Sequence, residues 1–483
     1  MIPQGVIRRD PHAFAADEYD LVVVGGGVYG ITLALEAARR GMRPLLLERG
    51  DFGGATSWNH LRIVHGGLRY LQLLDLRRFR ESVAERRWFL RHFPELVRPL
   101  PCLMPLYGDG LRTPAVMRAA LAMNDLLSAR RNVGVRDDAH LPRGRVLNPA
   151  ETAAMFPLVE RSGLRGGALW YDAVMTDPQR LLMELLRWAC VSGARALNYV
   201  EAVGLLEEDG RVTGVEGHDH VGAETLRFRA PVVVNCAGPW SRSLARDFDR
   251  DLPRLFRSSL AFNVWLRRAP SWEVAVAVTP RQPGARTYFM HPWHGGVLAG
   301  TYHGPWEGDA DAVAPTAAPI EELLSDLNAA VPGWGLRRDD VGEVYAGLLP
   351  VDRDGTIEIT KHPEIHDHGT AGGPAGLYSV SGVKFTTARD VAERLLRRIA
   401  GGDELPDATG ARPEPRPRLA WTAWEALRER DAAAAAAYLR GIVAEEAVVR
   451  REDLLLRRTD WTAGGRDATL DDEEVEGAAS PYG

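Results

Sequence analysis

Short apolar runs alternate with amphipathic stretches along most of this chain. Leu21–Val24 and Pro44–Leu47 are apolar runs of four residues, a length and composition typical of strands buried on both faces. Ile31–Arg40, between them, has the spacing of a helix. The order strand, helix, strand predicts a βαβ unit at the start of a parallel sheet.

A glycine turn joins the first apolar run to the helix. Gly25, Gly27 and Gly30 fit G-x-G-x-x-G, and Glu48 ends the second run. The glycines allow a tight turn, approach of a pyrophosphate and packing of helix on strand, while the acid accepts hydrogen bonds from ribose hydroxyls. These residues predict a dinucleotide site; the alternative is a glycine-rich turn in an ordinary βαβ unit.

The α/β pattern is interrupted and then resumed near 163–206, 231–240 and 377–399. Alternating and β-branched stretches predict that 255–350 is rich in strands. An NAD dehydrogenase usually continues with regularly alternating strands and helices, so the interruptions favour FAD. The three prolines of 96–106 predict that no regular element forms there.

The segment Thr113–Arg131 predicts an amphipathic helix whose apolar face holds Val116, Ala120, Met123 and Leu127. Such a face ordinarily packs on the protein core. The alternative is that it contacts a membrane surface or a partner.

Composition is that of a globular protein with two or three domains: 483 residues, 45% hydrophobic and 26% charged. A net charge of -6 gives no electrostatic footprint for nucleic acid. Cys102, Cys190 and Cys236 lie far apart in sequence, which argues against a disulfide framework or a metal site. No run is long enough to span a bilayer and no apolar signal segment is found, so a cytoplasmic location is expected.

Three segments closely resemble the FAD-dependent glycerol-3-phosphate dehydrogenases of the aerobic, quinone-linked type. They are ATSWNHLRIVHGGLRYL at 55–71, VVVNCAGPWS at 232–241 and GLYSVSGVKFTTARDVAERLL at 376–396. The resemblance implies an α/β fold in which a discontinuous, Rossmann-like FAD-binding domain is joined to an antiparallel-sheet substrate domain and a small helical C-terminal region.

The resemblance also implies domain boundaries. The FAD-binding domain is expected to comprise 19–75, 161–255 and 346–400. The remaining parts are expected to be a helical substrate region at 76–160, the substrate sheet at 256–345, a linker at 401–418, a helical cap at 419–470 and an acidic tail at 471–483.

Further FAD ligands follow from the resemblance, besides the three glycines and Glu48. They are Thr56, Ser57, Val200, Gly238, Gly382 and Thr386. The first two fall on the family's flavin-side loop, Val200 falls where a strand backbone meets the adenine, and Gly238 matches a second flavoprotein turn. The last two lie on a loop beneath the flavin, where a helix N-terminus would face developing negative charge.

Oxidation of a secondary alcohol needs a base for the hydroxyl proton and cations that hold the rest of the substrate. His65 is the best candidate base, because histidine titrates near neutral pH and this residue precedes the Gly-Gly turn of HGGLRYL; alternatively it only bonds backbone or flavin. Lys361 and Lys384 are the only lysines among 59 basic residues. The resemblance places both at substrate positions, Lys384 in catalysis and Lys361 in binding, unless Lys361 is a solvated strand-end residue.

One family motif is incomplete. The family's Gly-x-Arg-Pro-Leu is Gly347-Leu348-Leu349-Pro350-Val351 here, and we assign the missing arginine to Leu348. Loss of a bidentate phosphate donor would weaken phosphate recognition. The candidates that could restore charge or contact the substrate are Arg62, Arg69, Arg286 and His291.

These observations support two enzymatic functions. The first is an FAD-dependent dehydrogenase that oxidises sn-glycerol 3-phosphate or a related polyol phosphate and passes electrons to a quinone, with peripheral membrane contact and a homodimeric state as further expectations. The second is a flavin enzyme of the same fold that acts on a different hydroxy or amino compound, with oxygen as acceptor. A third function, flavin binding without catalysis, is disfavoured by His65 and Lys384.

Overall fold

The computed structural model of the chain describes residues 6–470 except 73, 109, 111, 252–254, 283, 352–358, 361, 403, 417, 467 and 469. Lys361 and the acidic tail at 471–483 therefore lie outside the described residues. The chain divides into two compact units, each assembled from separated segments. Unit 1 comprises 1–58, 179–259 and 348–483, and unit 2 comprises 59–178 and 260–347. Within the described residues, no helix is both long enough and apolar enough to cross a membrane.

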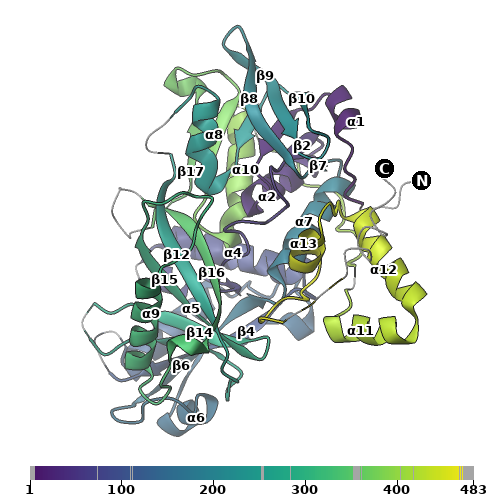
Figure 1. Cartoon of the computed structure of the whole chain (residues 1–483). Coiled ribbons are helices and arrows are strands. Elements are labelled where there is room, and N and C mark those ends of the chain that lie inside the picture. Colours follow the sequence, from purple (N-terminus) through teal and green to yellow (C-terminus); the bar gives the residue numbers. More distant parts are fainter. Residues whose placement is uncertain are drawn as a thin grey trace. The chain divides into compact units, whose positions relative to one another are not determined.

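Unit 1 contains a six-stranded sheet in the order β17-β18-β11-β1-β2-β7. Strands β2, β7 and β17 of this sheet are labelled in Figure 1. All neighbours pair in parallel except the edge strand β17. The strands are β1 Leu21–Val24, β2 Pro44–Leu47, β7 Arg195–Leu197, β11 Val233–Asn235, β17 Glu364–Asp367 and β18 Leu377–Ser381. The apolar runs of the sequence thus form the centre of a buried parallel sheet, as the composition of such strands requires.

Helices complete the α/β part of unit 1. They are α1 Pro11–Ala16, α2 Val28–Ala38, α7 Pro178–Val191, α8 Ser241–Asp247 and α10 Ala388–Ile399. Helix α2 follows the glycine turn and packs beside α10, although 349 residues of sequence lie between the two helices. The predicted helix at Ile31–Arg40 is confirmed, with its start three residues earlier.

A separate antiparallel sheet of three strands, in the order β10-β9-β8, belongs to the same unit. The strands are β8 Val200–Glu208, β9 Arg211–Asp219 and β10 Glu224–Arg229. Asp209 and Gly210 join the first two and both have positive φ, 50° and 73°, which is the backbone of a tight hairpin turn.

The C-terminal part of unit 1 is helical, as the resemblance implied. It contains α11 Trp421–Arg430, α12 Ala432–Glu445 and α13 Arg451–Asp453, followed by a wider helical turn at Leu454–Arg458. Trp421, Trp424 and Trp461 pack together at the centre of its own hydrophobic cluster. This region, residues 419–461, is called the C-terminal cap below.

Unit 2 is built on a nine-stranded sheet in the order β16-β12-β15-β14-β13-β4-β6-β3, with β5 paired to β6. The strands are β3 Ile63–Val64, β4 Val97–Leu106, β5 Arg145–Leu147, β6 Gly166–Met175, β12 Arg257–Leu266, β13 Ala275–Val278, β14 Tyr288–Trp293, β15 Gly296–Pro305 and β16 Val341–Val351. The pairing is mostly antiparallel, with β13 and β4 parallel.

The expectation that the prolines of 96–106 exclude a regular element is wrong. Pro99, Pro101 and Pro105 lie in β4, which pairs along its whole length with β6. Successive N–H groups of a strand point to opposite edges, so prolines at three odd-numbered positions remove donors from one edge only. On the other side, β13 pairs with Cys102 and Leu103 alone.

The helices of unit 2 are α3 Leu68–Gln72, α4 Leu76–His92, α5 Pro114–Leu127, α6 Pro149–Met155 and α9 Ala317–Ala330. Helix α9 supplies Ile320, Leu323, Leu324 and Leu327 to the main hydrophobic cluster of the unit, which also takes alternate residues of β12 and β14 and three residues of β15. One face of the sheet is therefore apolar and covered. The other face carries the polar residues described below.

Helix α5 forms as predicted, but the face assigned to the core is not the buried one. Met117 and Leu121 are the buried residues of this helix. Val116 and Met123 are 40% and 49% exposed, and Leu127 is 38% exposed. The expectation of ordinary core packing is therefore wrong for this face, because the helix is turned by about one residue relative to the assignment.

Candidate active site

The ribose end of the dinucleotide site is formed by Glu48 at the end of β2. Its two carboxylate oxygens accept hydrogen bonds from the N–H groups of Gly26 (2.6 Å) and Gly50 (2.8 Å). Burial raises the pKa of this carboxyl, although both hydrogen bonds act in the opposite direction. The carboxylate is thus held beside the glycine turn, and its remaining lone pairs can accept ribose hydroxyls.

The glycine turn itself admits no larger residue. A Cβ at Gly30 would lie 1.9 Å from the carbonyl oxygen of Gly25, and a Cβ at Gly25 would lie 2.6 Å from that of Cys236. Helix α2 therefore packs directly on the end of β1, with its N-terminal amides at the turn, which is the arrangement that receives a pyrophosphate. Turn, helix terminus and acid fit the AMP half of a dinucleotide.

Two predicted ligands that follow Glu48 form hydrogen bonds with backbone groups of unit 1, one of them at the start of α2. The hydroxyl of Ser57 accepts a hydrogen bond from the N–H of Val28 at the start of α2 (2.9 Å), and the hydroxyl of Thr56 donates to the carbonyl of Leu348 (3.3 Å). The N–H of Val200 donates to the carbonyl of Glu48 (2.9 Å), so the adenine candidate lies beside the ribose candidate.

Gly238 and the last loop complete the predicted cofactor residues of unit 1. Gly238 has φ 55° and open space at its Cβ position, so a ligand can approach its backbone closely. Thr386 is buried in the short helix Phe385–Thr387 that leads into α10.

Tyr29 fixes the loop that carries Lys384, a role that sequence reasoning missed. Its hydroxyl donates to the carbonyl of Lys384 (2.8 Å) and accepts from the N–H of the same residue (3.0 Å). Burial raises the pKa of Tyr29 to about 12, so the hydroxyl stays protonated. A Cβ at Gly382 would lie 1.9 Å from the tyrosine ring, which explains the glycine there. The tyrosine comes from the x-x of the glycine motif and so connects the first and last cofactor segments.

In unit 2, His65 is paired with a buried carboxylate. Its Nδ1 lies 3.3 Å from Oδ2 of Asp172, and its side chain is 49% exposed. The other carboxylate oxygen accepts from the N–H of Gly66 and from Arg86, both at 2.7 Å. Burial acts to raise the pKa of Asp172, but the hydrogen bond from His65 and the charge of Arg86 outweigh it and lower this pKa to about 2.

This carboxylate was not predicted from the sequence, although a signal exists. Asp172 is the single charged residue in the strand GGALWYDAVM at 166–175, and a charge in such a strand needs a partner. The Gly-Gly turn is explained by the same contact, because a Cβ at Gly66 would lie 1.9 Å from Arg86.

A cationic cluster in the same unit comprises Arg286, which precedes β14, His303 on β15 and Arg69 on α3. Arg286 donates to the carbonyl of His303 (2.5 Å), and its guanidinium lies 5.3 Å from the centre of the Tyr302 ring. Burial, with the charges of Arg286 and the exposed Arg69, lowers the pKa of His303 to about 4. The Nδ1 of His303 is buried with no hydrogen-bond partner among the described residues.

The base candidate shares one face of the sheet with His303, whereas Arg286 reaches the Tyr302 ring of the covered face. Met290 and Tyr302 belong to the covered apolar cluster. Because strand side chains alternate, Phe289 and His303 lie on the opposite face. The ring of His65 contacts that of Phe289, with centres 5.4 Å apart. His65 and His303 are therefore brought to the same face of the sheet.

The other two substrate candidates of unit 2 are more enclosed. Arg62 has φ 63° and is 2% exposed, with its guanidinium over the rings of Tyr345 (4.5 Å) and Trp293 (5.3 Å). His291 is 1% exposed, and its ring nitrogens face the carbonyls of Pro292 and Leu61. This geometry does not favour His291 as a substrate ligand.

The missing family arginine needs one correction. In Gly347-Leu348-Leu349-Pro350, the spacing between glycine and proline places the arginine position at Leu349 rather than Leu348. Leu348 is 1% exposed, and its carbonyl holds Thr56. Either residue is aliphatic, so the loss of a guanidinium stands.

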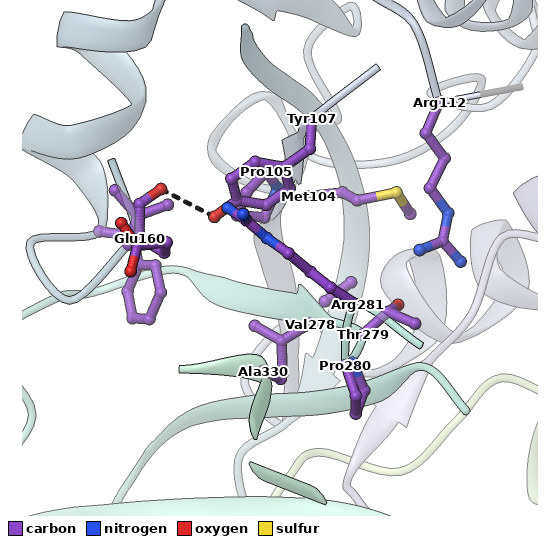
Figure 2. Close-up of a pocket in the computed structure, with 13 residues that line it drawn as sticks. Met104, Pro105, Tyr107, Arg112, Glu160, Val278, Thr279, Pro280, Arg281 and Ala330 are labelled. Carbon is purple, nitrogen blue, oxygen red and sulfur yellow. Dashed lines mark hydrogen bonds between the residues drawn. The ribbon is translucent and has the colours of Figure 1, made fainter. Parts of the chain in front are cut away.

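A pocket elsewhere in unit 2 is lined by Tyr107, Arg112, Glu160, Thr279 and Arg281, among others (Figure 2). The hydroxyl of Tyr107 donates to the carbonyl of Glu160 (2.9 Å), and Arg281 lies over the tyrosine ring. Its apolar lining includes Phe156, Val159 and Val278, which belong to the covered cluster. The pocket thus borders the apolar cluster of unit 2. Among the described residues, no group of three His, Cys, Asp or Glu side chains could hold a metal ion.

Residues 20–398 match the family described as FAD dependent oxidoreductase. This chain belongs to that family. As a member, it is an FAD-dependent oxidoreductase, and the turn, acid and loops of unit 1 are the residues that would hold the cofactor.

Relatives within this group carry a common name. A glycerol-3-phosphate dehydrogenase from Synechocystis sp. is 31% identical over 396 residues, which are 79% of this chain and 70% of the relative. A mitochondrial glycerol-3-phosphate dehydrogenase from Arabidopsis thaliana is 30% identical over 79% of this chain and 60% of its own length. The FAD-dependent oxidoreductase described here thus spans about 60 to 70% of these two relatives.

The fold is also found in solved structures. The glycerol-3-phosphate dehydrogenase from Bacillus halodurans, complexed with FAD, matches with a TM-score of 0.66 and 23% identity, covering 93% of this chain and 87% of that one. The α/β fold with a sheet-based second unit and a helical C-terminal region is therefore confirmed.

Proposed function

We propose that this enzyme oxidises glycerol 3-phosphate or a related polyol phosphate and passes the electrons to a quinone. The observation that carries the proposal is in unit 2, where the carboxylate-paired His65 lies on the same face of the sheet as His303, a buried histidine subject to the charges of Arg286 and Arg69. A polyol phosphate needs both, since one end loses a proton and the other carries negative charge.

His65 would act as the base. If Nδ1 carries the ring proton and donates it to Asp172, then Nε2 is the acceptor for the substrate hydroxyl proton. The carboxylate would stabilise the imidazolium that results, as a buried ionised group on the far side of the ring. Bound FAD would supply the chemistry of accepting the hydride from the carbinol carbon.

Arg69, Arg286 and His303 would hold the phosphate. Guanidinium groups match phosphate oxygens in geometry and charge, and the unpartnered Nδ1 of His303 adds a polar atom at the same place. This cluster would take over from the guanidinium that is missing at Leu349. Lys361 and Lys384 stay predictions, the first outside the described residues and the second on the loop fixed by Tyr29.

The alternative is a same-fold oxidoreductase for an unphosphorylated hydroxy or amino compound, with oxygen as acceptor. It is favoured by one observation, the aliphatic residues at 348 and 349.

Anaerobic mixing of the yellow holoenzyme with glycerol 3-phosphate, glycerol, amino acids and sugar phosphates distinguishes the proposed function from this alternative. The proposal predicts rapid bleaching of the flavin by glycerol 3-phosphate; bleaching by an unphosphorylated compound alone would contradict it. Reoxidation by a soluble quinone, compared with oxygen, tests the acceptor.

Peripheral membrane contact through α5 is part of the proposal. The helix exposes Val116, Met123 and Leu126, the last at 72%, beside the exposed Arg118 and Arg130. Exposed apolar and basic residues on one helix are typical of interfacial binding. Arg131 is not available for it, because it is 9% exposed and bonds the carbonyl of Leu141.

Co-sedimentation with anionic vesicles tests this contact. Wild type is expected to sediment, and L126S/M123S is expected to remain in solution with its FAD bound. Equal sedimentation of both would contradict the assignment. A homodimer and a location at the inner face of the membrane stay predictions, measurable by light scattering and by cell fractionation.

A further inference from the structure

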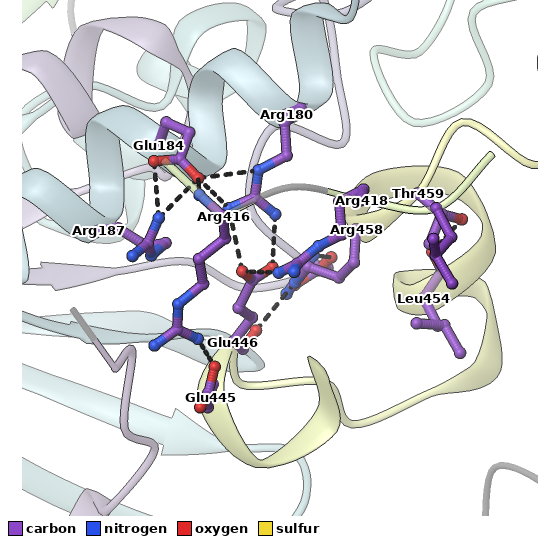
Figure 3. Close-up of polar contacts among 12 residues, drawn as sticks. Arg180, Glu184, Arg187, Arg416, Arg418, Glu445, Glu446, Leu454, Arg458 and Thr459 are labelled. Atoms are coloured by element: carbon purple, nitrogen blue, oxygen red, sulfur yellow. Dashed lines mark hydrogen bonds and ion pairs between the residues drawn. The ribbon is translucent and has the colours of Figure 1, made fainter. Parts of the chain in front are cut away.

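The loop at 48–51, which holds the ribose-binding candidate Glu48, contacts the C-terminal cap. Figure 3 shows the polar contacts between α7 and the cap region, including Arg180, Glu446 and Arg458. Arg180 on α7 binds both Glu184 (2.7 Å) and Glu446 (2.8 Å). All three side chains are buried, at most 4% exposed.

Glu446 is the centre of this network. Burial acts to raise its pKa, but the charges of Arg180 and Arg418 outweigh this and lower the pKa to about 2. The carboxylate is therefore ionised whenever the protein is folded near neutral pH. Its own backbone carbonyl accepts a hydrogen bond from Nε of Arg458 (2.9 Å), which links the network to the next contact.

Arg458 reaches the loop that follows Glu48. Its terminal nitrogens donate to the two oxygens of Asp51 at 2.6 and 2.7 Å, and Asn198 donates to the same carboxylate at 2.9 Å. The guanidinium is 0% exposed and Asp51 is 1% exposed. A buried bidentate pair of this kind fixes orientation as well as distance.

A second contact ties the loop between Asp51 and Glu48. The carbonyl of Gly50 accepts from the N–H of Tyr199 (2.8 Å), and the hydroxyl of Tyr199 donates to Asp453 of the cap (2.6 Å). The N–H of Gly50 in turn donates to Glu48. The cap thus holds two successive residues of the loop whose amide orients the ribose-binding carboxylate.

We propose that the C-terminal cap is a lock for FAD, and that Arg458 is its positioning residue. Acting through Asp51, it holds the loop 48–51 in the conformation that presents Glu48 to the ribose. Because coupling between two sites is reciprocal, FAD binding must also stabilise the cap. The proposal rests on the FAD site of unit 1 and is independent of which substrate the enzyme oxidises.

The first test needs no substitution. Hydrogen exchange of the full-length protein is compared with and without FAD, and the amides of 446–461 are expected to exchange at least ten times more slowly in the holoenzyme. Equal exchange of these amides in both forms would overturn the proposal.

The second test compares two variants of the same buried network. R458M is expected to raise the FAD dissociation constant at least tenfold, measured by reconstitution of apoprotein and flavin fluorescence. R412M is the matched control, because Arg412 pairs with Glu184 (3.3 Å) at the α7 side of the network and its side chain is 9% exposed. R412M is expected to lower thermal stability but leave FAD affinity within about twofold.

R458K is the conservative variant. It keeps the positive charge but loses the planar guanidinium that binds both oxygens of Asp51, so an intermediate FAD affinity is expected. D51N/R458M should be better folded than R458M alone, because the double variant has no buried carboxylate at position 51 that has lost its bidentate partner. Wild-type FAD affinity in R458M, or an equal loss in R412M, would contradict the lock. If R458M does not fold, R458K and the hydrogen-exchange measurement decide.

Discussion

The two functional regions of this enzyme are held in opposite ways. Around Glu48, the following loop is held by the buried pair of Arg458 and Asp51, and a Cβ at Gly25 or Gly30 of the adjoining turn would clash with a backbone carbonyl. Around His65, a single buried carboxylate sits behind a ring that is half exposed. The cofactor region is therefore rigid and the substrate region is open. This difference suits a cofactor that stays bound and a substrate that must enter and leave at each turnover.

The largest effect is expected from disturbing the rigid region. Gly30→Ala places a methyl group 1.9 Å from a carbonyl oxygen. Overpacking of this kind lowers the free energy of unfolding by about 1–3 kcal/mol. We expect loss of bound FAD and a lower melting temperature. Gly441→Ala on α12 has open space around it and should raise stability by about 0.5–1 kcal/mol. Retention of FAD by Gly30→Ala would show that the turn is less constrained than described.

In the open region, His65→Asn should leave FAD binding intact and slow the chemistry. Removal of a general base typically costs about 10²- to 10⁴-fold. The measurement is the rate of anaerobic flavin reduction at saturating substrate. His140→Asn, at an exposed histidine of the same unit, is the control. A reduction rate unchanged in His65→Asn would remove this residue from the proton-transfer step.

A smaller effect is expected in the pH dependence of stability, which the buried carboxylate of Glu446 in the rigid region should control. The pKa of Glu446 is about 2 in the folded protein and is near 4.5 when unpaired, so its stabilisation is complete above about pH 4.5 and is lost as the pH falls toward 2. The shift corresponds to at most about 3 kcal/mol. Denaturant unfolding of Glu446→Gln should show lower stability at pH 7 and a flatter acid limb. Glu429→Gln, exposed on α11, should match wild type at every pH.

The rigid region was largely predictable from sequence, because its parts are contiguous. Gly25, Gly27, Gly30 and Glu48 lie within one βαβ unit, and local spacing predicts them. Arg458 was not predicted as a partner of Asp51, since 407 residues separate them and no local pattern pairs two charges at that distance. The same limit applies to Tyr29 and Lys384.

The open region was predictable only in part. His65, Arg69 and Arg286 were identified as candidates, but their placement depends on the register of β14 and β15 and on the pairing of β6 with β3 and β4. His303 was a secondary candidate from the sequence, whereas Asp172, the partner of His65, came only from the fold. The orientation of α5 was assigned wrongly because an apolar stripe does not say which neighbour covers it.

The phosphate cluster tests the proposed function most directly. Rapid-mixing experiments should compare flavin reduction by glycerol 3-phosphate and by glycerol in wild type, Arg286→Met and Arg281→Met, the last at an exposed arginine that lies over the Tyr107 ring. We predict that wild type strongly prefers the phosphate, that Arg286→Met loses about 10- to 100-fold of that preference through weaker binding, and that Arg281→Met keeps it. Equal reduction of the wild-type enzyme by glycerol and glycerol 3-phosphate would contradict the account.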